Sequence, residues 1–247
     1  MTERLQAIYE PKGKAAEYAA YACNLYRGCT HGCTYCYAPQ VLHMDRPAFH
    51  SQCTERPGIL DKLRHDAKVI AEQGGLNDPV LFCFTSDPYQ PGANATRAAL
   101  CIMREFDVQF SILTKGYMAW RDFDLYGKDD LFGVTLTVGH PDSATWEPNA
   151  ATPAERMKNL YDAHNRGIRT WVSLEPVIEP AQTLRLIDIT HEYVDHYAVG
   201  KLNYHPLAAT IDWAKFLRDV LEKLKGYGNS YYIKESLREY KAAGEGE

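Results

Sequence analysis

Three cysteines lie close together near the N-terminus. Cys29, Cys33 and Cys36 follow one another in the spacing C-x3-C-x2-C, on a loop that also contains glycine. Thiolates are the usual protein ligands of iron–sulfur clusters, and this spacing lets three of them converge on one inorganic core. A [4Fe–4S] cluster has four irons, so three cysteines leave one iron open to a small molecule. The motif therefore favours a catalytic cluster over one that only transfers electrons.

A structural zinc site is the alternative interpretation of the same cysteines. Zinc usually takes four ligands, and His31 or Cys23 could supply the fourth. The remaining cysteines are expected to be buried thiols that behave as small hydrophobic side chains. They are Cys23, Cys53, Cys83 and Cys101.

The bulk composition is that of a globular protein. The chain has 247 residues, of which 45% are hydrophobic and 24% charged, so one domain over residues 1–247 is the default. Seven cysteines, three of them clustered, fit thiolate ligation in a reducing compartment better than a disulfide framework. The net charge of −5 argues against a wide positive surface for duplex nucleic acid. With no long apolar run and no secretory signal pattern, we expect a cytoplasmic protein without a membrane partner.

Strand and helix patterns alternate along the chain. Short apolar runs bounded by turn residues predict strands at 20–25, 79–85, 108–114, 131–138, 168–174, 196–202 and 231–233. Helical patterns lie between them at 57–73, 94–106, 153–167, 182–194 and 211–224, with Asn94 as one cap and Thr152 to Glu155 as a capping box. Six or seven β–α units in series predict an α/β fold with a parallel sheet and helices outside.

Polar residues follow several of these strands. They are Thr85-Ser86-Asp87, Thr114-Lys115, Glu175-Pro176 and Lys201-Leu202-Asn203. Because parallel α/β folds place their chemistry at the carboxyl ends of the strands, we expect a site at this edge of the sheet.

The cysteine motif, its flanks and several later motifs together resemble the radical S-adenosylmethionine (radical SAM) superfamily. Within it, the segment from Asn24 to Ala38 resembles the spore photoproduct lyase-like group, often labelled DNA repair photolyases. Further motifs of that group follow in the same order: Thr85 to Pro91, Leu113 to Lys115, Glu147-Pro148 with Arg156, and Val199 to Asn203. The resemblance covers about residues 20–205, and several ordered motifs are more specific than the cysteines alone.

The resemblance implies a fold, cofactors and partners. The fold would be a partial (β/α)6 TIM-type barrel, with a core at about 20–205 and a C-terminal β/α extension over 206–247. Cys29, Cys33 and Cys36 would hold a [4Fe–4S] cluster that binds S-adenosylmethionine (SAM) and cleaves it reductively to a 5′-deoxyadenosyl radical, which abstracts hydrogen from a substrate. The partner would be an electron donor such as flavodoxin or ferredoxin. The implied substrate is a nucleic-acid base or nucleotide.

The resemblance also implies which residues bind SAM. They are Ser86, Asp87, Lys115, Thr135, Thr137 and Arg156. Ser86 and Asp87 would accept hydrogen bonds from the methionine ammonium group, and Lys115 and Arg156 would bind its carboxylate. Thr135 and Thr137, on one face of a strand, would bond the ribose hydroxyls.

One position departs from the lyase. Spore photoproduct lyase has a hydrogen-donating cysteine immediately before its Thr-Ser-Asp, whereas this chain has Phe84 there and Cys83 one residue earlier. Neighbouring side chains of a strand point to opposite faces, so Cys83 is expected to face the helices. Tyr35 and Tyr37 match two tyrosines of the lyase. Together with Glu175 at a strand end, they are the expected catalytic residues.

Other interpretations stay open from the sequence alone. The radical could modify a peptide or a small metabolite, which the acidic net charge fits slightly better than a duplex substrate. A protein that binds a partner through an iron–sulfur or zinc centre, without catalysis, is a further alternative. In that case Asp87, Lys115 and Arg156 would not converge on one pocket. Separately, Lys115 and Arg156 could be ordinary surface charges. The Glu147-Pro148 pair is expected to shape a turn rather than to take part in chemistry.

Overall fold

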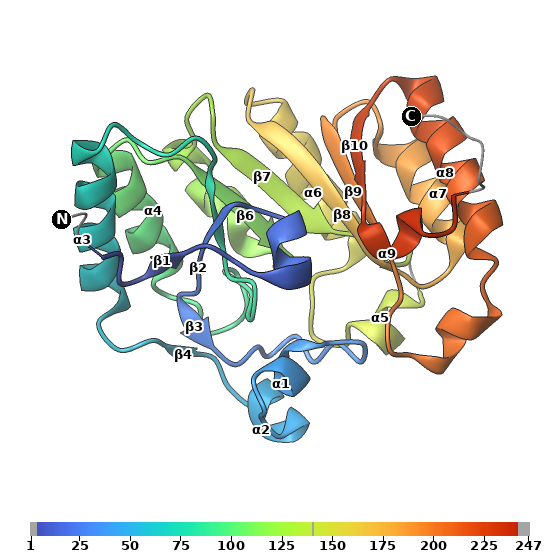
Figure 1. The fold of residues 1–247 in the computed structure, drawn as a ribbon, viewed down its shortest axis with the longest axis horizontal. Coiled ribbons are helices and arrows are strands. Elements are labelled where there is room, and N and C mark those ends of the chain that lie inside the picture. Colours follow the sequence, from blue (N-terminus) through green and yellow to red (C-terminus); the bar gives the residue numbers. More distant parts are fainter. Residues whose placement is uncertain (1–3, 140, 242–247) are drawn as a thin grey trace.

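A computed structural model describes residues 4–139 and 141–241, and it centres on one eight-stranded sheet (Figure 1). The strand order is β1-β2-β5-β6-β7-β8-β9-β10. The strands are β1 (Ile8–Tyr9), β2 (Tyr21–Cys23), β5 (Val80–Phe82), β6 (Phe110–Thr114), β7 (Leu131–Thr135), β8 (Arg169–Val177), β9 (His196–Lys201) and β10 (Ser230–Ile233). From β2 to β10 neighbouring strands are parallel, and β1 pairs antiparallel with β2 at one edge. The sheet is open, with β1 and β10 at its two edges.

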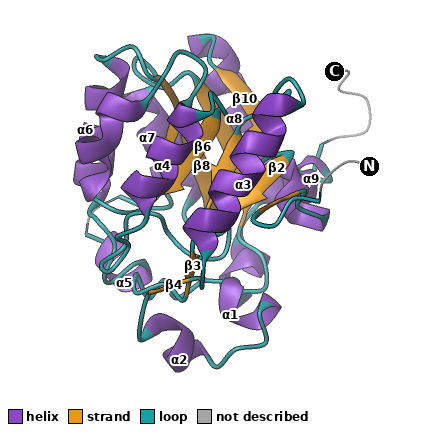
Figure 2. Cartoon of the chain, turned by 90° about the vertical axis from the view of Figure 1, so that its left-hand side faces the viewer, coloured by secondary structure: helices purple, strands orange, loops and turns teal. Residues whose placement is uncertain are grey.

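Helices alternate with these strands and pack outside the sheet (Figure 2). The long helices are α3 (Ile59–Glu72), α4 (Thr96–Glu105), α6 (Pro153–His164), α7 (Pro180–Thr190) and α8 (Trp213–Tyr227). The prediction of an α/β fold of the partial TIM-barrel type is therefore confirmed. The predicted C-terminal extension contains η3 (Pro206–Thr210), α8, β10 and α9 (Glu235–Arg238). Within the described residues, none of the helices combines the length and apolar character needed to cross a membrane.

Two helix starts test the capping predictions. The box at α6 is confirmed, because the Thr152 side chain accepts from the Glu155 N–H and the Glu155 side chain accepts from the Thr152 N–H. The prediction of Asn94 as the cap of α4 is wrong. That helix begins at Thr96 after Ala95. The Thr96 hydroxyl donates to Pro88 O at 2.5 Å, which connects this end of the helix to the loop after β5.

The inner face of the sheet carries a small apolar cluster separate from the large core under the helices. Its buried members are Leu81, Trp171 and Ala198, with Tyr18 and Phe84 packed against them. The indole of Trp171 lies so close to Gly133 that a Cβ there would be 2.4 Å from its ring. Tyr18 comes from the N-terminal segment, which passes in front of the sheet in Figure 1. The N-terminal segment therefore packs against the concave side of the open barrel.

Several short elements were not predicted, and those within residues 26–55 flank the cysteine loop. They are η1 (Gly13–Glu17), β3 (Tyr26–Arg27), α1 (Ala38–Val41), α2 (Arg46–His50), β4 (Thr54–Glu55), η2 (Met118–Leu125) and α5 (Ser143–Trp146). β3 and β4 form a separate two-stranded ladder. It lies with α1 and α2 below the main sheet in Figure 1, so the cysteine loop between β3 and α1 is held away from the long helices.

Candidate active site

The three clustered cysteines lie on the loop that joins β3 to α1. Cys33 is buried, and Cys29 and Cys36 are half-buried; all three are free thiols. Burial raises the pKa of Cys33 to about 11, although Lys115 opposes this rise. Burial also raises the pKa of Cys29 well above its ordinary value, and Cys33 and Cys36 add smaller contributions. Burial is therefore the main influence on the thiols of this loop.

Side chains from the strand ends fix the backbone of this loop. The Gln90 side chain accepts from Thr30 N at 2.7 Å and donates to Gly28 O at 3.2 Å. Asn149 donates its side-chain amide to Thr30 O at 3.1 Å and its backbone N–H to His31 O at 3.1 Å. The loops after β5 and β7 thus hold the cysteine loop from two directions.

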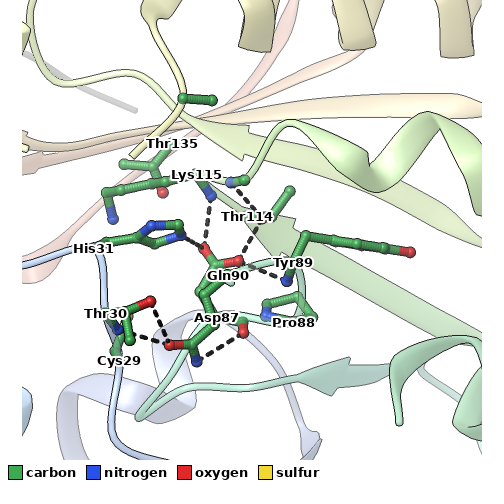
Figure 3. A network of polar contacts seen from close by, with 12 residues as sticks. Cys29, Thr30, His31, Asp87, Pro88, Tyr89, Gln90, Thr114, Lys115 and Thr135 are labelled. Atoms are coloured by element: carbon green, nitrogen blue, oxygen red, sulfur yellow. Dashed lines mark hydrogen bonds and ion pairs between the residues drawn. The ribbon is translucent and has the colours of Figure 1, made fainter. Parts of the chain in front are cut away.

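A buried carboxylate connects the cysteine loop to the ends of β5 and β6 (Figure 3). Asp87 accepts from Tyr89 N at 2.8 Å, from the Thr114 hydroxyl at 2.6 Å and from Lys115 N at 2.7 Å. His31 Nε2 lies 3.3 Å from Asp87 Oδ2. Burial alone would raise the pKa of Asp87, but His31 and these hydrogen bonds outweigh it and hold that pKa well below its usual range. Asp87 is therefore a buried, charged carboxylate that joins the cysteine loop to the loops after β5 and β6.

A second buried carboxylate was missed by the sequence analysis. Glu147 accepts hydrogen bonds from Tyr35, from Thr137 at 3.1 Å and from Arg156. Arg156 also donates to Thr135 O at 2.8 Å and is only 1% exposed. Burial would raise the pKa of Glu147, but Arg156 and Lys115 lower it below its ordinary value. The expectation that Glu147 merely shapes a turn is wrong, and so is the alternative that Arg156 is a surface charge.

Lys115 is the cation beside the cysteine thiols. Its Nζ lies 5.6 Å from the centre of the Tyr35 ring. Burial lowers the pKa of Lys115, but Cys33 and Glu147 more than offset this, so the pKa stays above its ordinary value. A permanent positive charge at this position suits a ligand that carries a carboxylate.

The hydroxyls after β5 supply unused hydrogen-bonding groups. Those of Thr85 and Ser86 are buried, and within the described part of the chain they lack an oxygen or nitrogen partner. Because a buried polar group without a partner is costly, such groups mark places where a ligand completes the site. Three thiols, a lysine and two unused hydroxyls at one edge of the sheet fit an iron–sulfur cluster with a bound amino-acid-like ligand.

The zinc alternative lacks a fourth ligand in this arrangement. Both ring nitrogens of His31 face other partners, since Nδ1 lies 3.2 Å from Asn149 O and Nε2 faces Asp87. Cys23 is fully buried in β2 among the residues of the large core.

The cysteines outside the motif differ in exposure. Cys23 and Cys83 are buried as expected, Cys53 is half-buried, and Cys101 is exposed on α4, so the expectation for Cys101 is wrong. Cys83 packs in the large core, whereas Phe84 packs with the inner cluster. Cys83 lies in the large core as expected, but strand alternation is not the reason, because β5 already ends at Phe82 and Cys83 has a φ of +70°.

Two expected catalytic residues lie toward the opening of the barrel. Tyr37 is 50% exposed and donates to Phe84 O at 2.9 Å. Glu175, at the end of β8, accepts a hydrogen bond from Tyr18. Since the Tyr18 hydroxyl has one hydrogen, Ser173 must donate to it across their 2.9 Å contact.

Lys234 completes this second polar group. It follows β10, is 2% exposed, and its Nζ lies 3.9 Å from Glu175 and 3.3 Å from the centre of the Tyr18 ring. Burial lowers the pKa of Lys234, although Glu175 opposes this. Neither Tyr18 nor Lys234 was predicted, because both lie outside the motifs and reach the site only through the fold.

Comparisons with known proteins agree with this architecture. The family model described as "Radical SAM superfamily" matches residues 23–194. A solved structure of a spore photoproduct lyase mutant with bound AdoMet and dinucleoside spore photoproduct aligns at a TM-score of 0.69 and 14% identity, over 87% of this chain and 76% of that one. The Streptococcus suis protein SuiB bound to S-adenosylmethionine aligns at 0.60 and 13%, over 88% of this chain and 51% of that one.

Two relatives in sequence are described as uncharacterized proteins. An uncharacterized protein of Methanocaldococcus jannaschii is 24% identical over 87% of this chain and 79% of its own length. An uncharacterized protein of Mycobacterium tuberculosis is 28% identical over 64% of this chain. The match spans about half, 49%, of that mycobacterial protein.

Proposed function

The chain belongs to the radical SAM superfamily of enzymes, and from this premise we propose that its substrate is a nucleic-acid base or a nucleotide. The cofactors of this superfamily are a [4Fe–4S] cluster and SAM. When bound, they supply a 5′-deoxyadenosyl radical that abstracts a hydrogen atom from the substrate. The observation that carries the proposal is the cysteine loop with Lys115 and the unused hydroxyls, on a fold similar to that of spore photoproduct lyase.

Different residues of the chain would bind the cluster and the methionine part of SAM. Cys29, Cys33 and Cys36 would hold the cluster. Lys115, whose charge acts on Cys33 and Cys36, is the proposed partner of the methionine carboxylate, and Ser86 is the proposed acceptor for its ammonium group.

The other predicted SAM ligands already have partners inside the protein. The acceptor sites of Asp87 and the donors of Arg156 bond to neighbouring residues, and Thr137 donates to Glu147. Direct contacts from Asp87, Thr137 and Arg156 to SAM therefore require an exchange of these bonds. Thr135 takes part here through its backbone carbonyl, which accepts from Arg156. We propose that Asp87 and Arg156 act mainly by holding the loops that carry the ligands.

The nucleic-acid part of the proposal rests on two features. The solved lyase carries a dinucleoside spore photoproduct on the same fold. Aromatic side chains line the inner face here, with Tyr18 and Phe84 6.0 Å apart, Tyr37 bonded to the Phe84 carbonyl, and Glu175 beside them. Such rings can stack on a base. Because Phe84 replaces the hydrogen-donating cysteine of the lyase, we propose a reaction that does not use a cysteine there.

Electron supply and location complete the proposal. Cluster reduction requires a one-electron donor, for which a flavodoxin or ferredoxin is the proposed partner. A reducing, cytoplasmic setting suits seven free cysteines, three of them clustered.

The first test is 5′-deoxyadenosine formation. Protein reconstituted without oxygen, given SAM and dithionite, should form 5′-deoxyadenosine; Cys36→Ala should abolish this, and Cys101→Ala, at an exposed thiol, should not. Deuterated oligonucleotides and nucleotides then test the substrate, since deuterium should appear in the 5′-deoxyadenosine. If no nucleic acid raises product above the substrate-free level, but a peptide or metabolite does, the nucleic-acid proposal fails.

A further inference from the structure

Short helix α2 holds the cysteine loop from the side away from the barrel. Arg46 Nη1 donates to Cys33 O at 3.2 Å, and Nη2 donates to Cys36 O at 2.6 Å. His50 Nδ1 lies 2.8 Å from Cys29 O. A carbonyl oxygen can only accept, so Nδ1 carries the hydrogen. Two side chains therefore bond the backbone carbonyls of all three clustered cysteines.

The local sequence explains how these two side chains come to face the loop. They stand four residues apart, which places them on one face of a helical turn. Asp45 caps this turn by accepting from Ala48 N at 3.1 Å, and Pro47 fits its first turn. The other nitrogen of His50, Nε2, is buried and has no hydrogen-bond partner in the described part of the chain. The contact with Cys29 is therefore the polar anchor of the ring.

Backbone packing shows independently that α2 is fitted to the loop. Cys29 N donates to Phe49 O at 3.1 Å. A Cβ on Gly28 would lie 2.2 Å from Gln52 O and 2.9 Å from Phe49 O, so only glycine permits this approach. Gly28 also has a φ of +75°, which glycine adopts without strain.

We propose that Arg46 and His50 are positioning residues for the cluster, and that Arg46 also favours its reduced state. Hydrogen bonds to the three carbonyls restrict the directions in which the thiols can point. Reduction adds one negative charge, which a nearby fixed positive charge stabilises. Arg46 is exposed on its outer side, so solvent weakens this effect without removing it. The inference rests on the assignment of the three cysteines as cluster ligands.

Hydrogen exchange of the metal-free chain tests the positioning role without any cluster. Arg46→Met and His50→Leu should each speed amide exchange in residues 29–38 by about tenfold, as expected for the loss of a strong hydrogen bond. His50→Asn, whose side-chain amide can replace Nδ1–H, should restore most of the protection. Arg64→Met is the matched control, since Arg64 is an exposed arginine that pairs with Glu105 on another face. Wild-type exchange in both Arg46→Met and His50→Leu would overturn the positioning role.

A redox titration of the reconstituted cluster, followed by electron paramagnetic resonance, tests the charge effect. Arg46→Met should lower the midpoint potential, whereas Arg46→Lys keeps the charge and should stay near the wild-type value. An unchanged potential in Arg46→Met, or an equal fall in Arg46→Lys, would overturn the charge effect. If the wild-type chain binds no cluster, the cysteine assignment fails, and the exchange result shows whether the contacts of α2 alone order the loop.

Discussion

Two regions at the carboxyl edge of the sheet differ in how their buried charges are hydrogen-bonded. Beside the cysteine loop, Asp87 and Glu147 each accept several hydrogen bonds, and Arg156 donates in three directions. At the ends of β8 and β10, Lys234 is equally buried, but its polar contacts are longer, to Lys14 O at 3.5 Å and to Glu175 Oε2 at 3.9 Å, and its Nζ lies 3.3 Å from the centre of the Tyr18 ring.

This difference indicates different uses for the two regions. Saturated charges fix the geometry of the loops around them, which suits the side that must hold a cofactor rigidly. A buried ammonium whose polar contacts are long destabilises the folded chain and keeps part of its hydrogen-bonding capacity for a ligand. We therefore expect the region of Tyr18, Glu175 and Lys234 to face the substrate, and the following predictions test the contrast.

The largest effect is expected from Arg156→Met. Removing the guanidinium leaves the buried Glu147 carboxylate without its cation, which costs about 3–5 kcal/mol. Urea unfolding of the metal-free chain measures the loss. Lys158→Met, on the exposed side of the same helix, should change stability by less than about 0.5 kcal/mol. Equal effects of the two variants would show that the Glu147–Arg156 pair beside the cysteine loop does not stabilise the fold.

Asp87→Asn should have the next largest effect. The neutral amide keeps the shape of the side chain but loses the ion pair with His31 and part of its accepting capacity, at about 2–3 kcal/mol. The same unfolding measurement applies, with Asp107→Asn as the exposed control. A variant as stable as the control would show that the contacts of Asp87 do not stabilise the fold.

Acid should lower the unfolding free energy, because the buried carboxylates beside the cysteine loop become protonated. The folded-state pKa values of Asp87 and Glu147 lie below their ordinary values near 4. Their contribution is therefore complete above about pH 5 and is lost as the pH falls toward the folded-state values, by up to about 1.4 kcal/mol per pH unit for each carboxyl. Unfolding free energies between pH 6 and 3 should show this slope, and Asp87→Asn should reduce it. An equal slope in the variant would contradict the prediction.

Lys234→Met should have the smallest effect on stability and the opposite sign. The pKa of Lys234 is lowered, so the unfolded chain binds more protons than the folded one, and the charged lysine opposes folding at neutral pH. The substitution should leave stability unchanged or raise it by up to about 1 kcal/mol, while substrate-dependent 5′-deoxyadenosine formation falls. Lys225→Met, at an exposed lysine of α8, is the control. A destabilised Lys234→Met with normal turnover would remove the contrast between the two regions.

The order of the strands and long helices could be predicted because it depends on local patterns. Apolar runs between turn residues gave the strand positions, and the capping box placed the start of α6 at Pro153. The short elements around the cysteines were missed, since four or five residues such as those of α2 carry no periodicity. Cap positions remained uncertain where a tertiary contact competes, as at Thr96, whose hydroxyl bonds to Pro88.

The sequence by itself determined the cysteine motif, the α/β order and the superfamily, because these reside in residue types and spacings along the chain. The tertiary structure decided which buried charges have all their hydrogen-bonding groups paired. Residues 31 and 87, and residues 35 and 147, meet because the loops at the carboxyl ends of parallel strands share one edge. Residues 18 and 175 meet because the N-terminal segment packs against the inner face of the sheet. Glu147 could not be recognised as a buried ion-pair partner, nor Lys234 as a buried cation, because burial depends on what packs over a side chain and not on its neighbours in sequence.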